Sequence, residues 1–223
     1  MSRCPELIPG LSQHLFKNII VVKNISKILS YIFHPLLIPT WFILLLLYSN
    51  PFSFAGMSVV LTVLNVTFQT FLMPFIAILL LIKLDLVNSV ELQDKQQRII
   101  PLVITIIFYL WFYKASQSLK YPVVMSIFML GAVVSLCLSF VINIFQKLSL
   151  HMVAISGALT AVLLLVFISP SDVSYYFLAI VVLTGAIASA RLYLNAHTMR
   201  EVYTGFMVGM FGQVAGLFLY QIF

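Results

Sequence analysis

Residues 122–145 read PVVMSIFMLGAVVSLCLSFVINIF, and no charged side chain interrupts this run. A helix needs about 20 apolar residues to cross the hydrocarbon layer of a bilayer. A strand of a membrane barrel would alternate apolar and polar residues, and this run does not alternate. Inside lipid the backbone polar groups must also be satisfied within the segment. The run therefore predicts a membrane-spanning helix.

The rest of the chain has the composition that this run implies. Of the 223 residues, 62% are hydrophobic and only 8% are charged, whereas a soluble domain carries roughly 25% charged residues. We expect an all-α polytopic bundle of about six to seven transmembrane helices in one domain, residues 29–223. Residues 1–28 form a basic leader, either an interfacial helix over 14–29 or an ordinary polar leader. The predicted spans are 29–48, 57–82, 99–115, 122–145, 151–168, 173–194 and 201–223.

Charges and small residues are unevenly placed along these spans. With seven spans, ten of the twelve Lys and Arg residues fall on the side that holds the N-terminus and the loops after the second, fourth and sixth spans. The positive-inside rule assigns that side to the cytoplasm. Small residues recur in the last three spans, and in lipid they let helix backbones approach closely. We therefore expect those three helices to pack tightly together.

The same side of the membrane carries residues suited to phosphoryl transfer. His197 and Glu201 are four residues apart, so they share a face of a helix. A carboxylate there can accept the Nδ1 hydrogen and leave Nε2 as a nucleophile. The forked donors of Arg191 suit phosphate oxygens, and His151 can protonate a leaving alkoxide. We therefore interpret these residues as a candidate hydrolytic site.

A stretch around these residues is similar to a known signature. Residues 190–205, ARLYLNAHTMREVYTG, resemble the third signature of the type 2 phosphatidic acid phosphatase superfamily. That signature has Ser-Arg, five residues, His, three residues and Asp, usually followed by a helix with glycines. Here Ala190 replaces the Ser and Glu201 replaces the Asp, while both gaps match.

The other two signatures of the superfamily are matched only in part. Ser149 and His151 correspond to two residues of the second signature, Pro-Ser-Gly-His. Lys95, Arg98 and Pro101 supply the residue types of the first signature, Lys, six residues, Arg-Pro, with different spacing. The resemblance places a phosphatase-like core at about residues 95–215.

The resemblance implies a metal-independent phosphatase that acts on a membrane lipid phosphate or a polyprenyl diphosphate and needs no cofactor. His197 would form a phosphohistidine, Glu201 would orient it, and His151 would be the general acid. Arg191, Arg98, Lys95 and Ser149 would bind phosphate. The implied partner is a membrane lipid rather than nucleic acid. Bacterial members commonly work on the outer face of the inner membrane, opposite to the side that the charges here indicate.

Two other functions bear on the same residues. A catalytically inactive relative that binds or transports a lipid or anion is the alternative, because the first two signatures are degraded. An intramembrane prenyl transferase would need Mg²⁺ held by two Asp-rich loops, whereas this sequence has one loop with Asp85 and Asp94. His34 is expected to have a structural place at the interface, although it could face the site.

Overall fold

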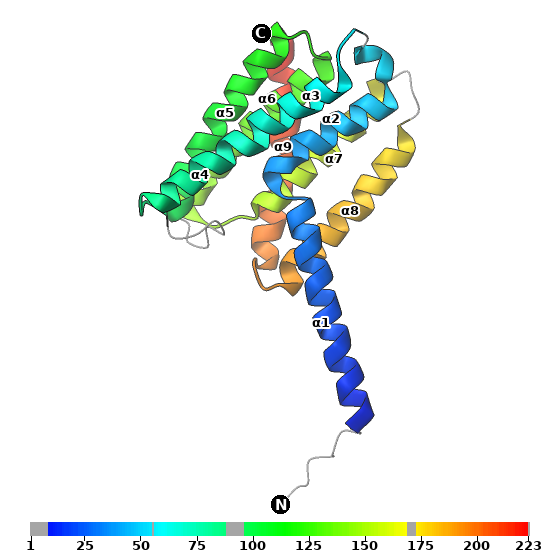
Figure 1. Ribbon diagram of the computed structural model, residues 1–223, viewed down its shortest axis with the longest axis vertical. Coiled ribbons are helices and arrows are strands. Elements are labelled where there is room, and N and C mark those ends of the chain that lie inside the picture. Colours follow the sequence, from blue (N-terminus) through cyan, green and yellow to red (C-terminus); the bar gives the residue numbers. More distant parts are fainter. Residues whose placement is uncertain (1–8, 55, 88–95, 169–172, 223) are drawn as a thin grey trace, which may run out of the picture.

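The computed structural model describes residues 9–54, 56–87, 96–168 and 173–222, and within them every regular element is a helix (Figure 1). The α-helices are α1 (Pro9–Ile32), α2 (Ile38–Ser49), α3 (Val59–Thr67), α4 (Met73–Lys83), α5 (Ile99–Ser118), α6 (Val123–Phe145), α7 (Leu150–Ile168), α8 (Ser174–Tyr193) and α9 (Met199–Ile222). The shorter turns are η1 (Pro35–Leu37), η2 (Pro51–Phe54), η3 (Phe68–Leu72) and η4 (Gln96–Arg98).

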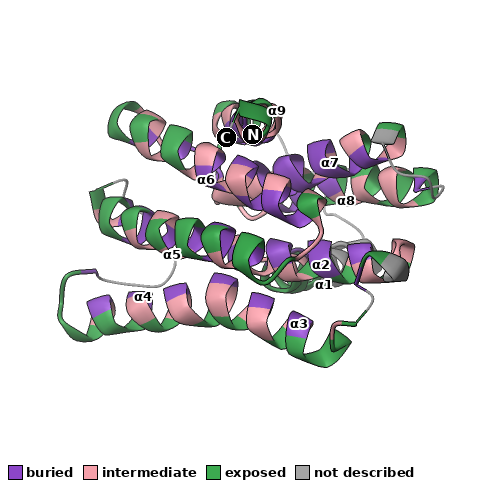
Figure 2. Ribbon diagram, turned by 90° about the horizontal axis from the view of Figure 1, so that it is seen from above, coloured by how far each residue is buried: buried purple, intermediate pink, exposed green. Residues whose placement is uncertain are grey.

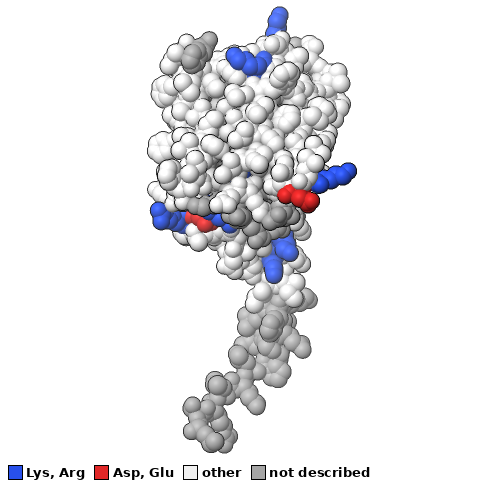
Figure 3. Space-filling view, turned by 90° about the vertical axis from the view of Figure 1, so that its left-hand side faces the viewer, with Lys and Arg blue, Asp and Glu red and all other residues white. Residues whose placement is uncertain are grey.

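The predicted all-α membrane bundle is confirmed in the described residues. Six helical segments are long and apolar enough to cross a bilayer, and a seventh follows if α1 and α2 count as one broken span. Large apolar side chains face outward all around the bundle, as lipid-facing residues do, for example Trp111, Phe167 and Phe218. Figure 2 shows the buried residues on the facing sides of the helices. On the face shown in Figure 3, a broad belt without charge separates Lys or Arg residues at one end of the bundle from Lys, Arg, Asp and Glu residues toward the other.

The first predicted span, 29–48, is not one continuous helix. α1 ends at Ile32 and α2 begins at Ile38, with a bend of 45° between the two segments. The cause is Pro35, since the residue before a proline avoids helical backbone angles. His34 accordingly has an extended backbone, with φ −61° and ψ 140°. α1 also runs through the predicted boundary at residue 28, so the leader and the first apolar run share a helix.

The second predicted span is also interrupted, by the π-helical turn η3 between α3 and α4. Pro74 lies one residue into α4. The nitrogen of Pro74 carries no hydrogen, so it cannot donate to the carbonyl one turn earlier, and the proline ring collides with that carbonyl. A wider turn relieves this collision. This segment still qualifies as a single span, Val59–Lys83.

The tight packing expected in the last three helices is found between α7 and α9, whereas α8 packs along α7 and contacts α9 little. α9 packs along both α6 and α7. A Cβ on Gly205 would lie 2.5 Å from the Ser149 carbonyl oxygen, and one on Gly209 would overlap the backbone of α7. In contrast, a Cβ on Gly185 of α8 would have nothing within 4 Å. The glycines of α9 therefore bring the first turns of α7 and α9 together.

Candidate functional site

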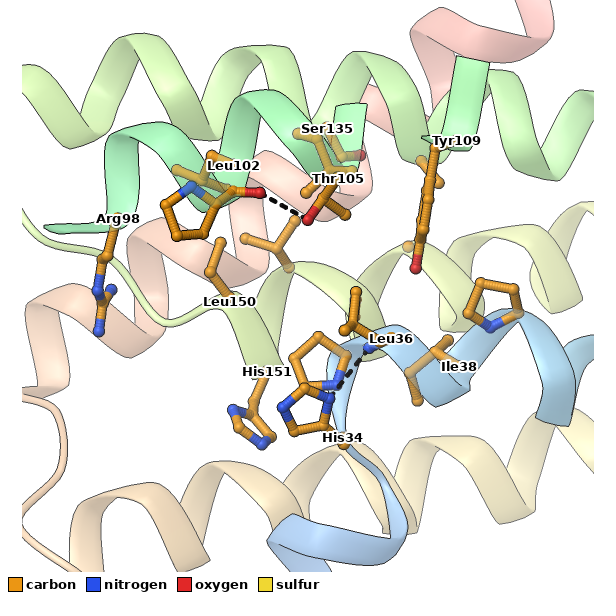
Figure 4. Close-up of a pocket in the computed structure, with 18 of the residues that line it drawn as sticks. His34, Leu36, Ile38, Arg98, Leu102, Thr105, Tyr109, Ser135, Leu150 and His151 are labelled. Carbon is orange, nitrogen blue, oxygen red and sulfur yellow. Dashed lines mark hydrogen bonds between the residues drawn. The ribbon is translucent and has the colours of Figure 1, made fainter. Parts of the chain in front are cut away.

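Three histidines and two arginines from separate segments converge on one cavity of about 160 Å³. A single water needs about 15 Å³ of such space, so the cavity has room for a larger ligand. Figure 4 shows Arg98, His151 and His34 toward one end of the cavity and Tyr109 toward the other. The five residues come from the break before η1, from η4, from the start of α7, from the end of α8 and from the α8–α9 connection: His34, Arg98, His151, Arg191 and His197.

His197 and Glu201 form the closest polar pair in this cluster. The Nδ1–H group of His197 donates to Glu201 Oε2 at 2.7 Å. The same oxygen accepts from the backbone N–H of Thr198 at 3.3 Å, and the Glu201 N–H donates to Thr198 Oγ1 at 3.4 Å. This reciprocal capping box begins α9 and fixes the carboxylate. The arrangement leaves Nε2 of His197 with its lone pair, as the four-residue spacing predicts.

The surroundings of His197 keep its imidazole neutral. Burial and the positive charges of Arg191 and Arg98 together lower the pKa of His197 to about 4, although the hydrogen bond that His197 donates to Glu201 opposes this shift. Its ordinary pKa is about 6.5. At neutral pH the ring is therefore unprotonated at Nε2, which is the state that a nucleophile requires.

His151 is held from the opposite side by α1. Its Nε2–H group donates to the Ser30 carbonyl oxygen at 3.1 Å. Its ring meets the ring of His34 edge-on, with 5.7 Å between the centroids. Because Nε2 is used in this way, Nδ1 is the ring nitrogen that can exchange a proton with a ligand.

The two arginines line the cavity while bonded to neighbouring elements. Arg98 Nη1 donates to the Leu148 carbonyl oxygen at 2.9 Å, which ties η4 to the segment before α7. Arg191 Nη1 donates to Ser30 Oγ at 3.4 Å. The two guanidinium groups bring fixed positive charge to the same end of the cavity, because a guanidinium stays protonated at any relevant pH.

Of the predicted phosphate ligands, Ser149 does not line the cavity and Lys95 is not described. The Ser149 side chain is fully buried but does not line the cavity. Its backbone N–H donates instead to the Glu201 carbonyl oxygen at 3.1 Å, which links the starts of α7 and α9. Lys95 lies outside the described residues, as does Asp94.

Three residues at or beside the cavity are not among the predicted site residues: His34, Ser30 and Gln213. His34 lines the cavity beside His151, and its Nδ1 accepts from the Leu36 N–H at 3.4 Å, which leaves Nε2–H as a donor. The His-Pro pair at the helix break is the signal that could have identified it. Ser30 and Gln213 carry no such signal, because a buried Ser or Gln in an apolar run is common in membrane helices.

Comparisons with protein-family models, curated proteins and solved structures gave no match to this chain. Among the described residues, no three His, Cys, Asp or Glu side chains gather as metal ligands would. The resemblance to the phosphatase superfamily stays a prediction.

Proposed function

We propose that the protein is a membrane-embedded phosphatase that hydrolyses a lipid phosphate through a phosphohistidine on His197. The observation that carries the proposal is the His197–Glu201 pair, which lies at the end of a cavity that Arg98, Arg191 and His151 also line. Ionisable residues near the bilayer are costly, so their convergence points to a functional site. Arginine forks and imidazoles suit a phosphate group, because they donate hydrogen bonds to its charged oxygens.

In the first step, Nε2 of His197 attacks phosphorus and the bond to the lipid oxygen breaks. Glu201 accepts the Nδ1–H hydrogen bond at 2.7 Å and so offsets the positive charge that develops on the ring. Arg98 and Arg191 bind the non-bridging oxygens and stabilise the transition state. His151 takes the proton of the bound phosphate monoanion at Nδ1 and gives it to the departing alkoxide, while Ser30 holds the other ring nitrogen.

In the second step, water replaces the histidine on phosphorus. His151, now neutral, takes a proton from the attacking water, and the P–N bond to His197 breaks. Phosphate leaves with the oxygen of that water, and His197 returns to its starting state. The protons balance, because His151 passes one from the substrate phosphate to the alkoxide in the first step and one from water to the leaving phosphate in the second.

One observation favours the alternative of a catalytically inactive protein that binds a lipid or anion. His151 and Arg98 already have backbone carbonyl partners, at 3.1 Å and 2.9 Å respectively. Such bonds give both side chains a structural role that needs no reaction. An inactive protein would bind a phosphate analogue such as vanadate in this cavity but release no phosphate from any lipid.

Phosphate release by purified protein in detergent, with EDTA present, distinguishes the two. The panel holds a diacylglycerol phosphate, phosphatidylglycerol phosphate and a polyprenyl diphosphate. We expect turnover of at least one lipid and a loss of at least about a thousandfold in His197→Asn, since the nucleophile is removed. Arg191→Lys should lose about a hundredfold, because the second forked donor is gone.

Arg200→Ala is the matched control, because Arg200 is an exposed arginine beside the same loop that neither lines the cavity nor bonds to His197. It should keep the parent rate. Equal rates in the parent and His197→Asn, or no release from any lipid by folded protein, would remove the proposal.

A further inference from the structure

The inner half of the cavity is apolar and lies within the transmembrane segments. Phe75 of α4, Leu102 of α5 and Phe128 of α6 line it, deeper in the bundle than the ionisable end. A phosphate group needs none of this surface. An apolar pocket that continues from a polar end is typical of a site for an amphipathic ligand, with a few placed polar groups that fix its orientation.

Gln213 of α9 is the exception in this apolar half. Its side chain is 1% exposed and lines the cavity, yet neither Oε1 nor Nε2 has a hydrogen-bond partner among the described residues. Other polar groups there are satisfied: Thr105 Oγ1 donates to the Pro101 carbonyl oxygen at 2.7 Å (Figure 4), and Ser135 Oγ donates to the Gly131 carbonyl oxygen at 2.8 Å. Buried amides are almost always paired, so this amide calls for a partner.

The packing of α6 against α9 fixes where this amide lies. A Cβ on Gly131 of α6 would overlap Oε1 and Cδ of Gln213, so the glycine leaves the space that the amide occupies. Gly212 and Gly216 place α6 close to α9 on either side of Gln213. α9 meets the first turn of α7 at Gly205, and eight residues along a helix correspond to about 12 Å. The amide lies beside Gly131 and therefore about this far into the bundle from Gly205.

We propose that Gln213 binds an ester carbonyl of the lipid substrate, so that the site takes an acyl-ester glycerol phosphate rather than a polyprenyl phosphate. This inference rests on the proposed function, because a bound phosphate sets the position of the tail. The Nε2 hydrogens of Gln213 donate to the carbonyl oxygen. In a glycerol phosphate lipid, the ester carbonyls follow the phosphate by a few bonds and lead directly into the acyl chains.

The chemistry of the alternatives decides between the substrate classes. A prenyl chain is hydrocarbon throughout and offers no group to this amide, so it would bury the amide unpaired. An ether-linked dialkyl lipid has the shape of the ester lipid but lacks the carbonyl. A site built to bond a polar group of its substrate discriminates against an analogue that lacks it, because its own buried group then stays unpaired.

The experiment compares kcat/KM for a dioleoyl glycerol phosphate, its dialkyl ether counterpart and a prenyl phosphate. We expect the parent to prefer the ester over the ether by about tenfold, the effect of one hydrogen bond to a neutral group. Gln213→Leu and Gln213→Met should remove this preference, mainly by raising KM for the ester. Ser139→Ala, a buried polar residue of α6 that does not line the cavity, should keep it.

Equal use of ester and ether by the parent, faster use of the prenyl phosphate, or an unchanged preference in both Gln213 variants would overturn the inference. If folded protein releases no phosphate at all, the proposed function fails. Binding of an ester lipid in the apolar half of the cavity is then tested separately. The readout is then the melting temperature with dioleoylglycerol or with its dialkyl ether. Stronger stabilisation of the parent by the ester, lost in Gln213→Leu, supports binding of the ester carbonyl by Gln213. Equal stabilisation by the ester and the ether overturns it.

Discussion

One carboxylate oxygen of Glu201 accepts two hydrogen bonds. Its Oε2 accepts from the Thr198 backbone N–H and from Nδ1 of His197. A glutamate three residues after a threonine is the usual partner in a helix capping box. The capping box also sets the ring of His197 before any ligand arrives.

The low pKa of His197 predicts an activity that survives into acid. The ring must be neutral to attack, so the acidic limb of the activity profile is expected as the pH falls through about 4. Replacing Arg191 by Gln removes one nearby positive charge, which raises the pKa of His197 and moves the acidic limb of kcat/KM to higher pH. The measurement is the pH profile of parent and variant with one substrate, whose own ionisation is common to both.

Arg200→Gln serves as the charge-matched control for this titration and should leave the acidic limb in place. An acidic limb at the same pH in the parent and in Arg191→Gln would contradict the electrostatic role of Arg191.

At this scale the sequence predicts part of the site. The spacing of His197 and Glu201 predicts their hydrogen bond, because four residues make about one helical turn. The contacts of Ser30 with His151 and Arg191 are not predictable in the same way, since they join residues more than a hundred positions apart. The hydroxyl of Ser149 shows the converse: a motif match placed beside the site does not determine where its side chain points.

Among the elements, α9 decides the geometry of the site. It starts at the capping box, runs beside α7 from Gly205 onward and reaches Gln213 against α6. Its glycines therefore set both the distance between the two histidine-bearing helix starts and the depth of the polar group in the inner cavity.

We predict that Gly205→Ala destabilises the protein and lowers its activity, whereas Gly185→Ala changes neither. The added methyl at residue 205 would meet the backbone of Ser149, which cannot move without shifting α7, while the methyl at residue 185 meets nothing within 4 Å. Overpacking of this kind costs about 1–3 kcal/mol. Melting temperatures in detergent test this, and equal values for the two variants would show that the close approach of α7 and α9 is not needed.

The helices themselves are largely predictable, because long apolar runs are read directly from the sequence. Their interruptions are not, because membrane helices often tolerate proline. Pro35 breaks the first run and Pro74 follows a widened turn within the second. The break at Pro35 is the one with consequences for the site, since it presents His34 to the cavity and directs the end of α1 over His151.

For the molecule as a whole, the arrangement matches the two parts of a lipid phosphate. The ionisable cluster lies at one end of the bundle, and the apolar half of the same cavity extends into the membrane belt. A phosphate group can remain at the polar end while its tail stays among apolar side chains. The proposed function therefore has one central requirement, a phosphoryl group held against Nε2 of His197.

Trapping the phosphoryl-enzyme tests this requirement most directly. Parent protein is mixed with a phosphorus-32-labelled lipid phosphate, quenched in alkali within one turnover and analysed by peptide mass spectrometry, since phosphohistidine is labile in acid. We predict a phosphoryl group on His197 that appears and decays during turnover and is absent in His197→Asn. Release of phosphate without any label on His197, or with the label on another residue, would contradict the account.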